Sequence, residues 1–184
     1  MRLLAILAVA VLVVACSDDD DEELVPDGLE TEPIASVPVD WPTYTNPDGL
    51  FSLRHPPDWH ELDNAFYSYD PTEDGSKILP PEEVKVEVNY YQAKGSTGCF
   101  ALDIDPETGE VSSVEPGATE STLGGEPAWD IVRTPPEIQE PATRAHSRAL
   151  VREGLCMGIV AYFTQETPDE SLFSQIASTL EFGP

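Results

Sequence analysis

The chain has 184 residues, and its 35 Asp+Glu against 9 Lys+Arg give a formal net charge of -26 at pH 7. This length leaves room for one domain of ordinary size with a hydrophobic core. The negative charge argues against a nucleic-acid partner, because such binding depends on Lys and Arg neutralising phosphates.

An apolar segment opens the chain and ends at a cysteine. Arg2 is followed by 13 apolar residues without interruption, residues 3–15. As a helix this segment would span about 20 Å, which is shorter than the roughly 30 Å hydrocarbon core of a bilayer. A positive start, a short apolar stretch and a small residue at its end are typical of a secretory signal. We therefore expect residues 1–15 to be a signal peptide.

The end of that segment, VVAC at residues 13–16, resembles the lipobox of bacterial lipoproteins. The resemblance implies cleavage just before Cys16, a diacylglyceryl group on its sulfur and often an acyl chain such as palmitate on the new amino terminus. Two acyl chains anchor a protein stably, where one binds only marginally. The alternatives are an ordinary signal with an unmodified Cys16 and an uncleaved helix, which the acids after Cys16 disfavour at about 2.5–3.5 kcal/mol per Asp.

An acidic segment follows the cysteine. Residues 17–40 hold 10 acids, no bases and scattered prolines, without hydrophobic periodicity. Such a composition is typical of a disordered spacer. We therefore interpret residues 16–40 as the lipidated cysteine and a tether that holds a domain, residues 41–184, away from the membrane.

Short alternating segments separated by Pro and Gly dominate residues 41–184 and predict strands. Two of them lie at residues 50–55 and 65–70. The segment EVKVEVNYY gives the clearest strand, with a core face and a water face: Val84, Val86, Val88 and Tyr90 on the first, Lys85, Glu87 and Asn89 on the second.

The second half of the domain continues this pattern. CFALDIDPETGEVSSV predicts a hairpin with its turn at residues 105–109, and AWDIVRT predicts a strand after Gly124 and Gly125. PPEIQEPAT is a loop, because its prolines lack amide donors. RAHSRALVREGLCMGIVAYFT predicts two strands about a turn at Glu153 and Gly154. Turns this short favour an antiparallel sheet.

One segment of the domain has helical periodicity. In TPDESLFSQIAS, Thr167 and Glu170 have the spacing of a capping box and Pro168 suits the first helical position. An apolar stripe should bury this helix against the sheet, formed by Leu172, Phe173, Ile176 and Ala177.

Three motifs together resemble the PsbP-like family: YTNPDGLFSLRHPPDW, GGEPAWDIV and FSQIASTLEF, within residues 43–183. The resemblance implies an α+β fold, an antiparallel β-sheet with helices packed on its faces in an α/β/α sandwich. Characterised members mostly dock onto other proteins, and many are bacterial lipoproteins. The resemblance transfers no catalytic residue.

Two cysteines remain once Cys16 is acylated. Cys99 and Cys156 form an even pair in an oxidising compartment, which favours a disulfide. Its loop would contribute about 4 kcal/mol in the chain-entropy model. The alternative is a Cys99 nucleophile with His60 or His146 as its base, although no neighbouring motif indicates a lowered thiol pKa.

Metal-binding patterns are weak. His55, His60 and His146 lack the spacing of zinc ligands, and we expect them at the surface or in turns. Alternating acids hint at calcium, namely Asp103, Asp105 and Glu107. They do not match an EF-hand loop, because Gly109 is at the seventh position instead of the sixth, so an acidic hairpin turn is the better interpretation.

These patterns predict a lipid-anchored, extracytoplasmic protein of the cell membrane or cell surface. Its domain would bind a protein or cell-envelope component without catalysis and without a cofactor. An enzyme remains an alternative, a hydrolase of envelope material that uses a carboxylate pair from the set Asp103, Asp105, Glu126 and Asp130. A binder of divalent cations is the third possibility.

Overall fold

The central element is a seven-stranded antiparallel sheet. A computed structural model of the chain describes residues 36–72, 79–138, 141–165 and 167–184. In spatial order the strands of this large sheet are β3 (His60–Leu62), β4 (Ala65–Tyr67), β5 (Val84–Gln92), β12 (Leu155–Phe163), β11 (Arg144–Arg152), β10 (Glu126–Arg133) and β9 (Thr119–Leu123). The antiparallel pairing and the hairpin of β11 and β12 confirm the predictions from sequence.

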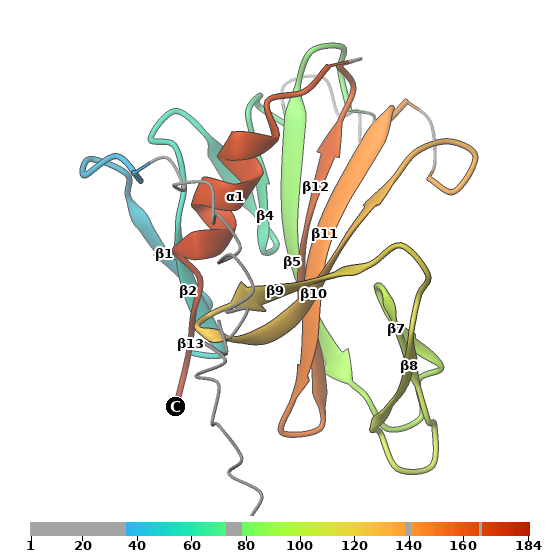
Figure 1. Cartoon of the computed structure of the whole chain (residues 1–184). Coiled ribbons are helices and arrows are strands. Elements are labelled where there is room, and N and C mark those ends of the chain that lie inside the picture. The colour runs from blue at the N-terminus through green and yellow to red at the C-terminus, as the bar shows by residue number, and fades with distance from the viewer. Residues whose placement is uncertain (1–35, 73–78, 139–140, 166) are drawn as a thin grey trace, which may run out of the picture. The chain divides into compact units, whose positions relative to one another are not determined.

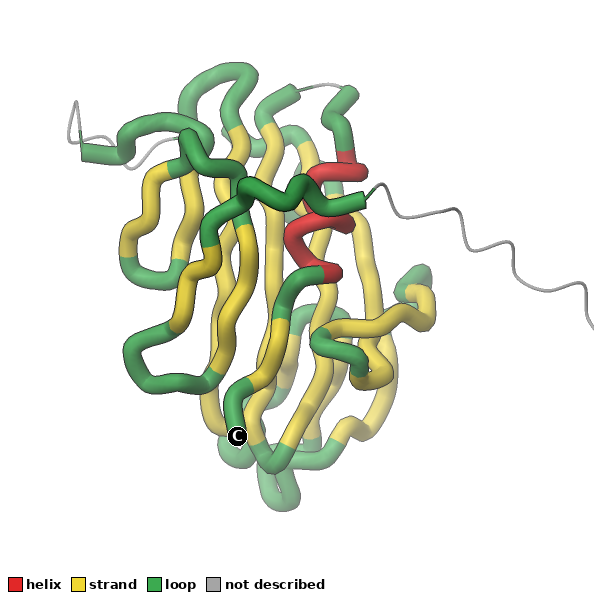
Figure 2. Tube along the Cα trace, turned by 90° about the vertical axis from the view of Figure 1, so that its left-hand side faces the viewer, coloured by secondary structure: helices red, strands yellow, loops and turns green. Residues whose placement is uncertain are grey.

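Smaller elements lie on the two faces of the large sheet. One three-stranded sheet has the order β1 (Thr43–Thr45), β2 (Phe51–Arg54) and β13 (Glu181–Phe182). It lies on the same side as α1 (Glu170–Ser178) (Figure 1, Figure 2). The other three-stranded sheet lies on the opposite side and consists of β6 (Gly98–Cys99), β7 (Leu102–Ile104) and β8 (Val111–Val114).

The main core fills the space between the large sheet and α1. Val84, Val86 and Val88 point into it, as their alternation predicts. From the other side come Phe51 and Phe173, each 1% exposed. Burying a side chain of this kind contributes roughly 1.5–3 kcal/mol. Because this cluster is larger than the hydrophobic cluster on the other face, it provides most of the hydrophobic stabilisation of the described residues.

The prediction of an α/β/α sandwich is wrong. The described residues contain a single helix, nine residues long, and the fold is mostly β. The physical reason lies in the periodicity: the segments that cover the sheet alternate with a period of two and are broken by Pro and Gly, so they form short strands. Helices on both faces were implied by the PsbP-like resemblance and have no counterpart in the hydrophobic pattern.

The helix also begins later than predicted. Its N-cap is Asp169, whose carboxylate accepts a hydrogen bond from the backbone N–H of Ser171 at 3.0 Å. The predicted capping box fails because the Glu170 side chain pairs with Arg144 instead. Within the described ranges, no helix combines the length and apolar character needed to cross a membrane.

Candidate functional site

The strand registers place five side chains in one row across the large sheet. Tyr67 pairs with Lys85, Lys85 with Tyr162, Tyr162 with Ala145, and Ala145 with Arg133. Directly opposite residues of antiparallel strands lie on the same face, and these positions alternate with those that meet α1. The row therefore crosses the face that α1 does not cover.

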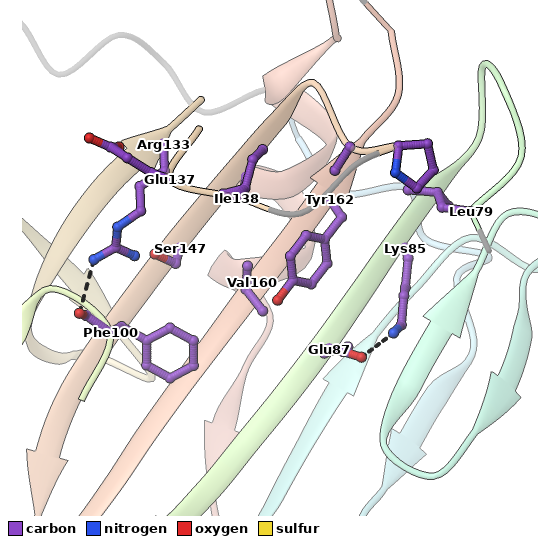
Figure 3. Close-up of a pocket in the computed structure, with 13 residues that line it drawn as sticks. Leu79, Lys85, Glu87, Phe100, Arg133, Glu137, Ile138, Ser147, Val160 and Tyr162 are labelled. Atoms are coloured by element: carbon purple, nitrogen blue, oxygen red, sulfur yellow. Dashed lines mark hydrogen bonds and ion pairs between the residues drawn. The ribbon is translucent and has the colours of Figure 1, made fainter. Parts of the chain in front are cut away.

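An open cleft lies on this face. The β6–β8 sheet covers one end of the face, and a cleft of about 680 Å³ remains beside it (Figure 3). Its floor comes from β5, β11 and β12, and consists of Lys85, Glu87, Ala145, Ser147, Val160 and Tyr162. Its sides consist of Leu79, Phe100, Arg133 and the loop residues Glu137, Ile138, Pro141 and Ala142.

Two ion pairs lie on opposite sides of the cleft. Lys85 pairs with Glu87, and both side chains are 26% exposed. Burial acts to lower the pKa of Lys85, but the hydrogen bond and the charge of Glu87 raise it above its usual value. On the other side, Arg133 pairs with Glu115 and donates a hydrogen bond to the Phe100 carbonyl at 3.0 Å. Each base is therefore charged and neutralised locally.

Tyr162 lies between these two pairs. Burial raises the pKa of its hydroxyl, and the charge of Glu87 adds to that effect, while Lys85 and Arg133 oppose it. The ammonium of Lys85 is 5.8 Å from the centre of the Tyr162 ring and 5.6 Å from that of Tyr67. Tyr162 therefore offers the cleft a neutral hydroxyl and a half-buried aromatic ring.

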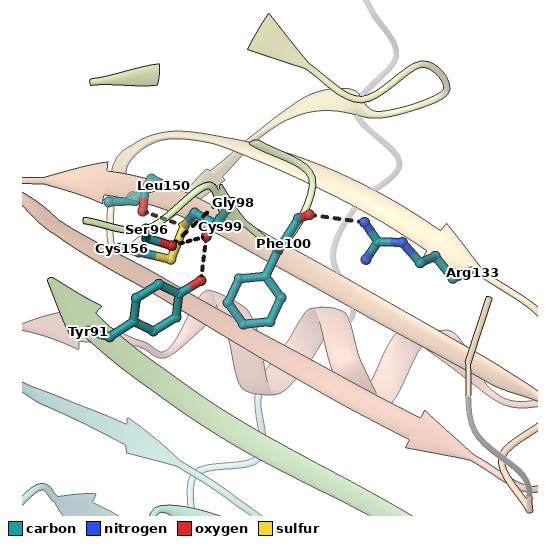
Figure 4. Close-up of a disulfide and its surroundings, with 8 residues drawn as sticks. All are labelled: Tyr91, Ser96, Gly98, Cys99, Phe100, Arg133, Leu150 and Cys156. Atoms are coloured by element: carbon teal, nitrogen blue, oxygen red, sulfur yellow. Dashed lines mark hydrogen bonds between the residues drawn. A yellow bond between two sulfur atoms is a disulfide. The ribbon is translucent and has the colours of Figure 1, made fainter. Parts of the chain in front are cut away.

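A disulfide fixes one side of the cleft. Cys99 of β6 and Cys156 of β12 are bonded (Figure 4), with their Cα atoms 5.7 Å apart and both residues fully buried. The next residue, Phe100, has φ 56°, a region in which a bulky residue is uncommon. This conformation aims the Phe100 carbonyl at Arg133 and sets its ring against Gly158 of β12.

Gly158 is required at this point of β12, beneath the ring of Phe100. A Cβ atom added there would lie 2.2 Å from Cε2 of Phe100, well inside the contact distance of about 3.5 Å. The ring of Phe100 thus occupies the space that any side chain at Gly158 would need.

A second cluster of charged residues lies under α1, on the other face of the sheet. His146 contacts Asp130 through Nε2, and its Nδ1 is 3.3 Å from a carboxylate oxygen of Glu170. Arg148 donates to Asp130 at 2.7 Å. Burial alone would raise the pKa of Asp130, but His146 and Arg148 lower it below its usual value. The ring of His146 is 4.2 Å from that of Phe173 on α1, so this cluster joins the helix to the sheet.

The carboxylates considered for hydrolysis are not among the residues that line the cleft. Asp130 belongs to the cluster under α1, and Glu126 pairs with Arg152. These two acids of β10 are four residues apart, or about 13 Å along a strand. Asp103 accepts a hydrogen bond from Ser113 on the neighbouring strand of its hairpin.

The candidate calcium ligands form a turn. Asp105 accepts hydrogen bonds from the backbone N–H groups of Glu107 at 2.8 Å and Thr108 at 3.1 Å, and the Glu107 side chain is exposed. In the part of the chain that the structure describes, no three His, Cys, Asp or Glu residues are grouped so that they could hold a metal ion. The acidic hairpin turn is the arrangement found here.

Two of the three histidines are buried, whereas all three were expected at the surface or in turns. His60 is exposed, but His55 and His146 are 2% and 8% exposed. His55 binds Glu61 and the Pro56 carbonyl, each at 2.8 Å. Since Cys99 is disulfide-bonded and buried, its sulfur is not a free nucleophile. Cys16, predicted to carry the lipid, and the signal peptide lie outside the described residues.

Sequence reasoning missed the cleft. It assigned Lys85 and Glu87 to a water-facing side, and Arg133 and Tyr162 lie far apart in the chain. Only the register of β10, β11, β12 and β5 brings them together. The available signal was Tyr162 itself, an amphipathic ring near the end of an otherwise apolar strand.

Comparisons with known proteins do not identify a family. No family model matches the chain, and no curated protein matches it. One solved structure with a match is a protein from Bacteroides thetaiotaomicron, with a TM-score of 0.46 and 14% sequence identity. The match covers 77% of this chain and 48% of that one, so this chain spans about half the length of the protein it matches. The resemblance to the PsbP-like family stays a prediction.

Proposed function

We propose that this chain is an extracytoplasmic lipoprotein, anchored through Cys16, whose domain binds a protein or cell-envelope component in the cleft. The observation that carries the proposal is the open cleft beside the β6–β8 sheet, which brings two ion pairs and the half-buried Tyr162 together. Concave sites with a few fixed polar groups are where proteins usually bind ligands. The disulfide of Cys99 and Cys156 supports an oxidising, extracytoplasmic compartment.

The geometry supports binding better than catalysis. A general acid or base needs a pKa near the working pH and a position within reach of the substrate. In the cleft, the pKa values of Lys85 and Tyr162 are both raised, which moves them further from neutrality. Asp130 has a lowered pKa, but its carboxylate is committed to His146 and Arg148 under α1. The ion pairs of the cleft instead present donors and acceptors held in fixed positions.

Photocrosslinking in cells tests the binding site. A photoreactive benzoylphenylalanine would replace Ile138, which lines the cleft, in the full-length lipoprotein. The control places the same group at Val132, which is 43% exposed and lies on the face of β10 opposite to that of Arg133. We expect light-dependent adducts at Ile138 that are absent at Val132 and that disappear with Tyr162→Ala. The absence of adducts at Ile138, or equal adducts at both sites, would contradict the proposal.

Mass spectrometry of the full-length product tests the anchor. We expect a mature chain that begins at Cys16 and carries diacylglycerol, and a Cys16→Ala control that keeps its leader. A purified chain that retains Met1 and has an unmodified thiol at Cys16 would contradict the anchor without affecting the cleft.

A further inference from the structure

We propose that the cleft binds a neutral, hydroxyl-rich carbohydrate, with Tyr162 against the sugar and the two ion pairs bonded to its hydroxyl groups. This inference rests on the proposal that the cleft is the binding site. It follows from four features of the cleft, namely its paired charges, its unused donors, its aromatic rings and the closed backbone of its floor.

The paired charges favour a neutral ligand. An anion would find Lys85 and Arg133 already neutralised by Glu87 and Glu115, and it would approach a chain with a net charge of -26. A cation would have to displace one of the bases from its carboxylate. A hydroxyl group both donates and accepts, so it can accept from Lys85 and donate to Glu87 while leaving the ion pair intact.

Donors remain free on both sides of the cleft. Arg133 has five N–H donors, yet within the described ranges all of its hydrogen bonds come from Nη2. Lys85 has three donors and bonds to Glu87. No hydrogen bond joins the hydroxyl of Tyr162 to another described residue, although this hydroxyl lies within the electrostatic reach of Glu87 and Arg133.

The spacing of these groups suits an extended polar molecule. Lys85 and Arg133 are three strands apart in one row, which corresponds to about 14 Å between their backbones. In this row Tyr162 is next to Lys85, and only the small Ala145 separates Tyr162 from Arg133. Aromatic rings supply flat apolar area with a polar tip, which matches a sugar ring with one C–H face and a rim of hydroxyl groups.

The floor also argues against an extended peptide. Peptides commonly add a strand to a free sheet edge, where backbone hydrogen bonds provide the affinity. The cleft lies over β5, β12 and β11, each paired on both sides. An apolar ligand is equally unsuited, because it would bury Lys85 and Arg133 without replacing their water. Side chains alone must recognise the ligand here, and they are hydrogen-bonding groups and rings.

Calorimetry on the full-length, detergent-solubilised lipoprotein tests the inference. The probes are neutral oligosaccharides of glucose, mannose, xylose and N-acetylglucosamine, with polygalacturonate as the anionic comparison. We expect at least one neutral probe to bind with a dissociation constant of about 1 mM or tighter. Its affinity should not change with salt, because a neutral ligand gains nothing from unscreened charge.

Variants locate the binding. Tyr162→Phe keeps the ring and removes the hydroxyl, and Tyr162→Ala removes both; we expect affinity losses of about threefold and about tenfold or more. Val132→Ala, on the opposite face, should bind like the wild type. Failure of every neutral probe, unchanged affinity in both Tyr162 variants, or salt-dependent binding of polygalacturonate alone would overturn the inference.

The two proposals fail in distinguishable ways. In one outcome, the neutral probes fail to bind while the photoreactive group at position 138 still forms adducts. If protease removes those adducts and glycosidase does not, the cleft binds a protein and only the carbohydrate inference is wrong. If Ile138 captures nothing, the cleft is not the binding site and both proposals are wrong.

Discussion

Replacing Gly158 by alanine tests the contact that shapes the cleft. The new Cβ would lie 2.2 Å from Cε2 of Phe100, and carbon atoms in contact prefer about 3.5–4.0 Å. The ring must therefore move by more than about 1 Å. Because an extra methyl group in a packed site costs about 1–3 kcal/mol, we expect Gly158→Ala to lower the free energy of unfolding by about 2 kcal/mol.

Urea denaturation of a double-mutant cycle measures this cost. In a Phe100→Ala background the space beside Gly158 is free, so Gly158→Ala should cost less than about 0.5 kcal/mol. In that background Gly158→Ala can even raise the free energy of unfolding, since alanine loses less backbone entropy on folding than glycine. Gly98→Ala is the matched control, because its Cβ would lie 3.7 Å from the Leu102 carbonyl, an ordinary contact. Equal costs of Gly158→Ala in both backgrounds would refute the reasoning.

Three further changes test the rest of the structure. Asp130→Asn should cost about 3 kcal/mol near pH 7, because Arg148 keeps a buried charge without its carboxylate. Folding lowers the pKa of Asp130, so its contribution to stability is present above the pKa of the unfolded state, about 4, and is lost as the pH falls below that value. Urea denaturation at several pH values should therefore show that the variant loses less unfolding free energy at acid pH than the wild type. Identical pH profiles would contradict this role. Replacing Cys99 and Cys156 together by alanine should lower stability by about 4 kcal/mol from the 57-residue separation, and a loss below about 1 kcal/mol in urea would contradict that estimate. Phe173→Ala should cost about 3–5 kcal/mol by thermal or urea melting, because this ring is 1% exposed; a near-neutral effect would mean that α1 does not seal the core.

Local patterns predicted the individual elements. The alternation around Val86 identified β5 and its buried face, and the turn at Glu153 and Gly154 identified the hairpin of β11 and β12. These predictions succeed because alternation and turn chemistry act over a few residues. The start of α1 was missed because Asp169 competes as a cap and Glu170 is drawn to Arg144, a residue distant in the sequence.

Long-range pairing decided the rest. The sequences of β5 and β12 do not predict that these two strands are neighbours, although nine residue pairs join them. Without this register, Lys85 and Tyr162 were unrelated side chains and the cleft could not be predicted. The fold class was wrong for a different reason: helices on both faces were implied by the PsbP-like resemblance, whereas the segments that cover the sheet have the period-two alternation of short strands.

The central claim is that a ligand occupies the cleft in the intact cell envelope, and hydroxyl-radical footprinting tests this claim most directly. The full-length protein would be labelled in intact cell envelopes and again after extraction into detergent. We predict slower oxidation of Tyr162 and Phe100 in envelopes, with no change at Tyr91, which is 39% exposed and does not line the cleft. Equal oxidation of Tyr162 in both preparations would contradict the account.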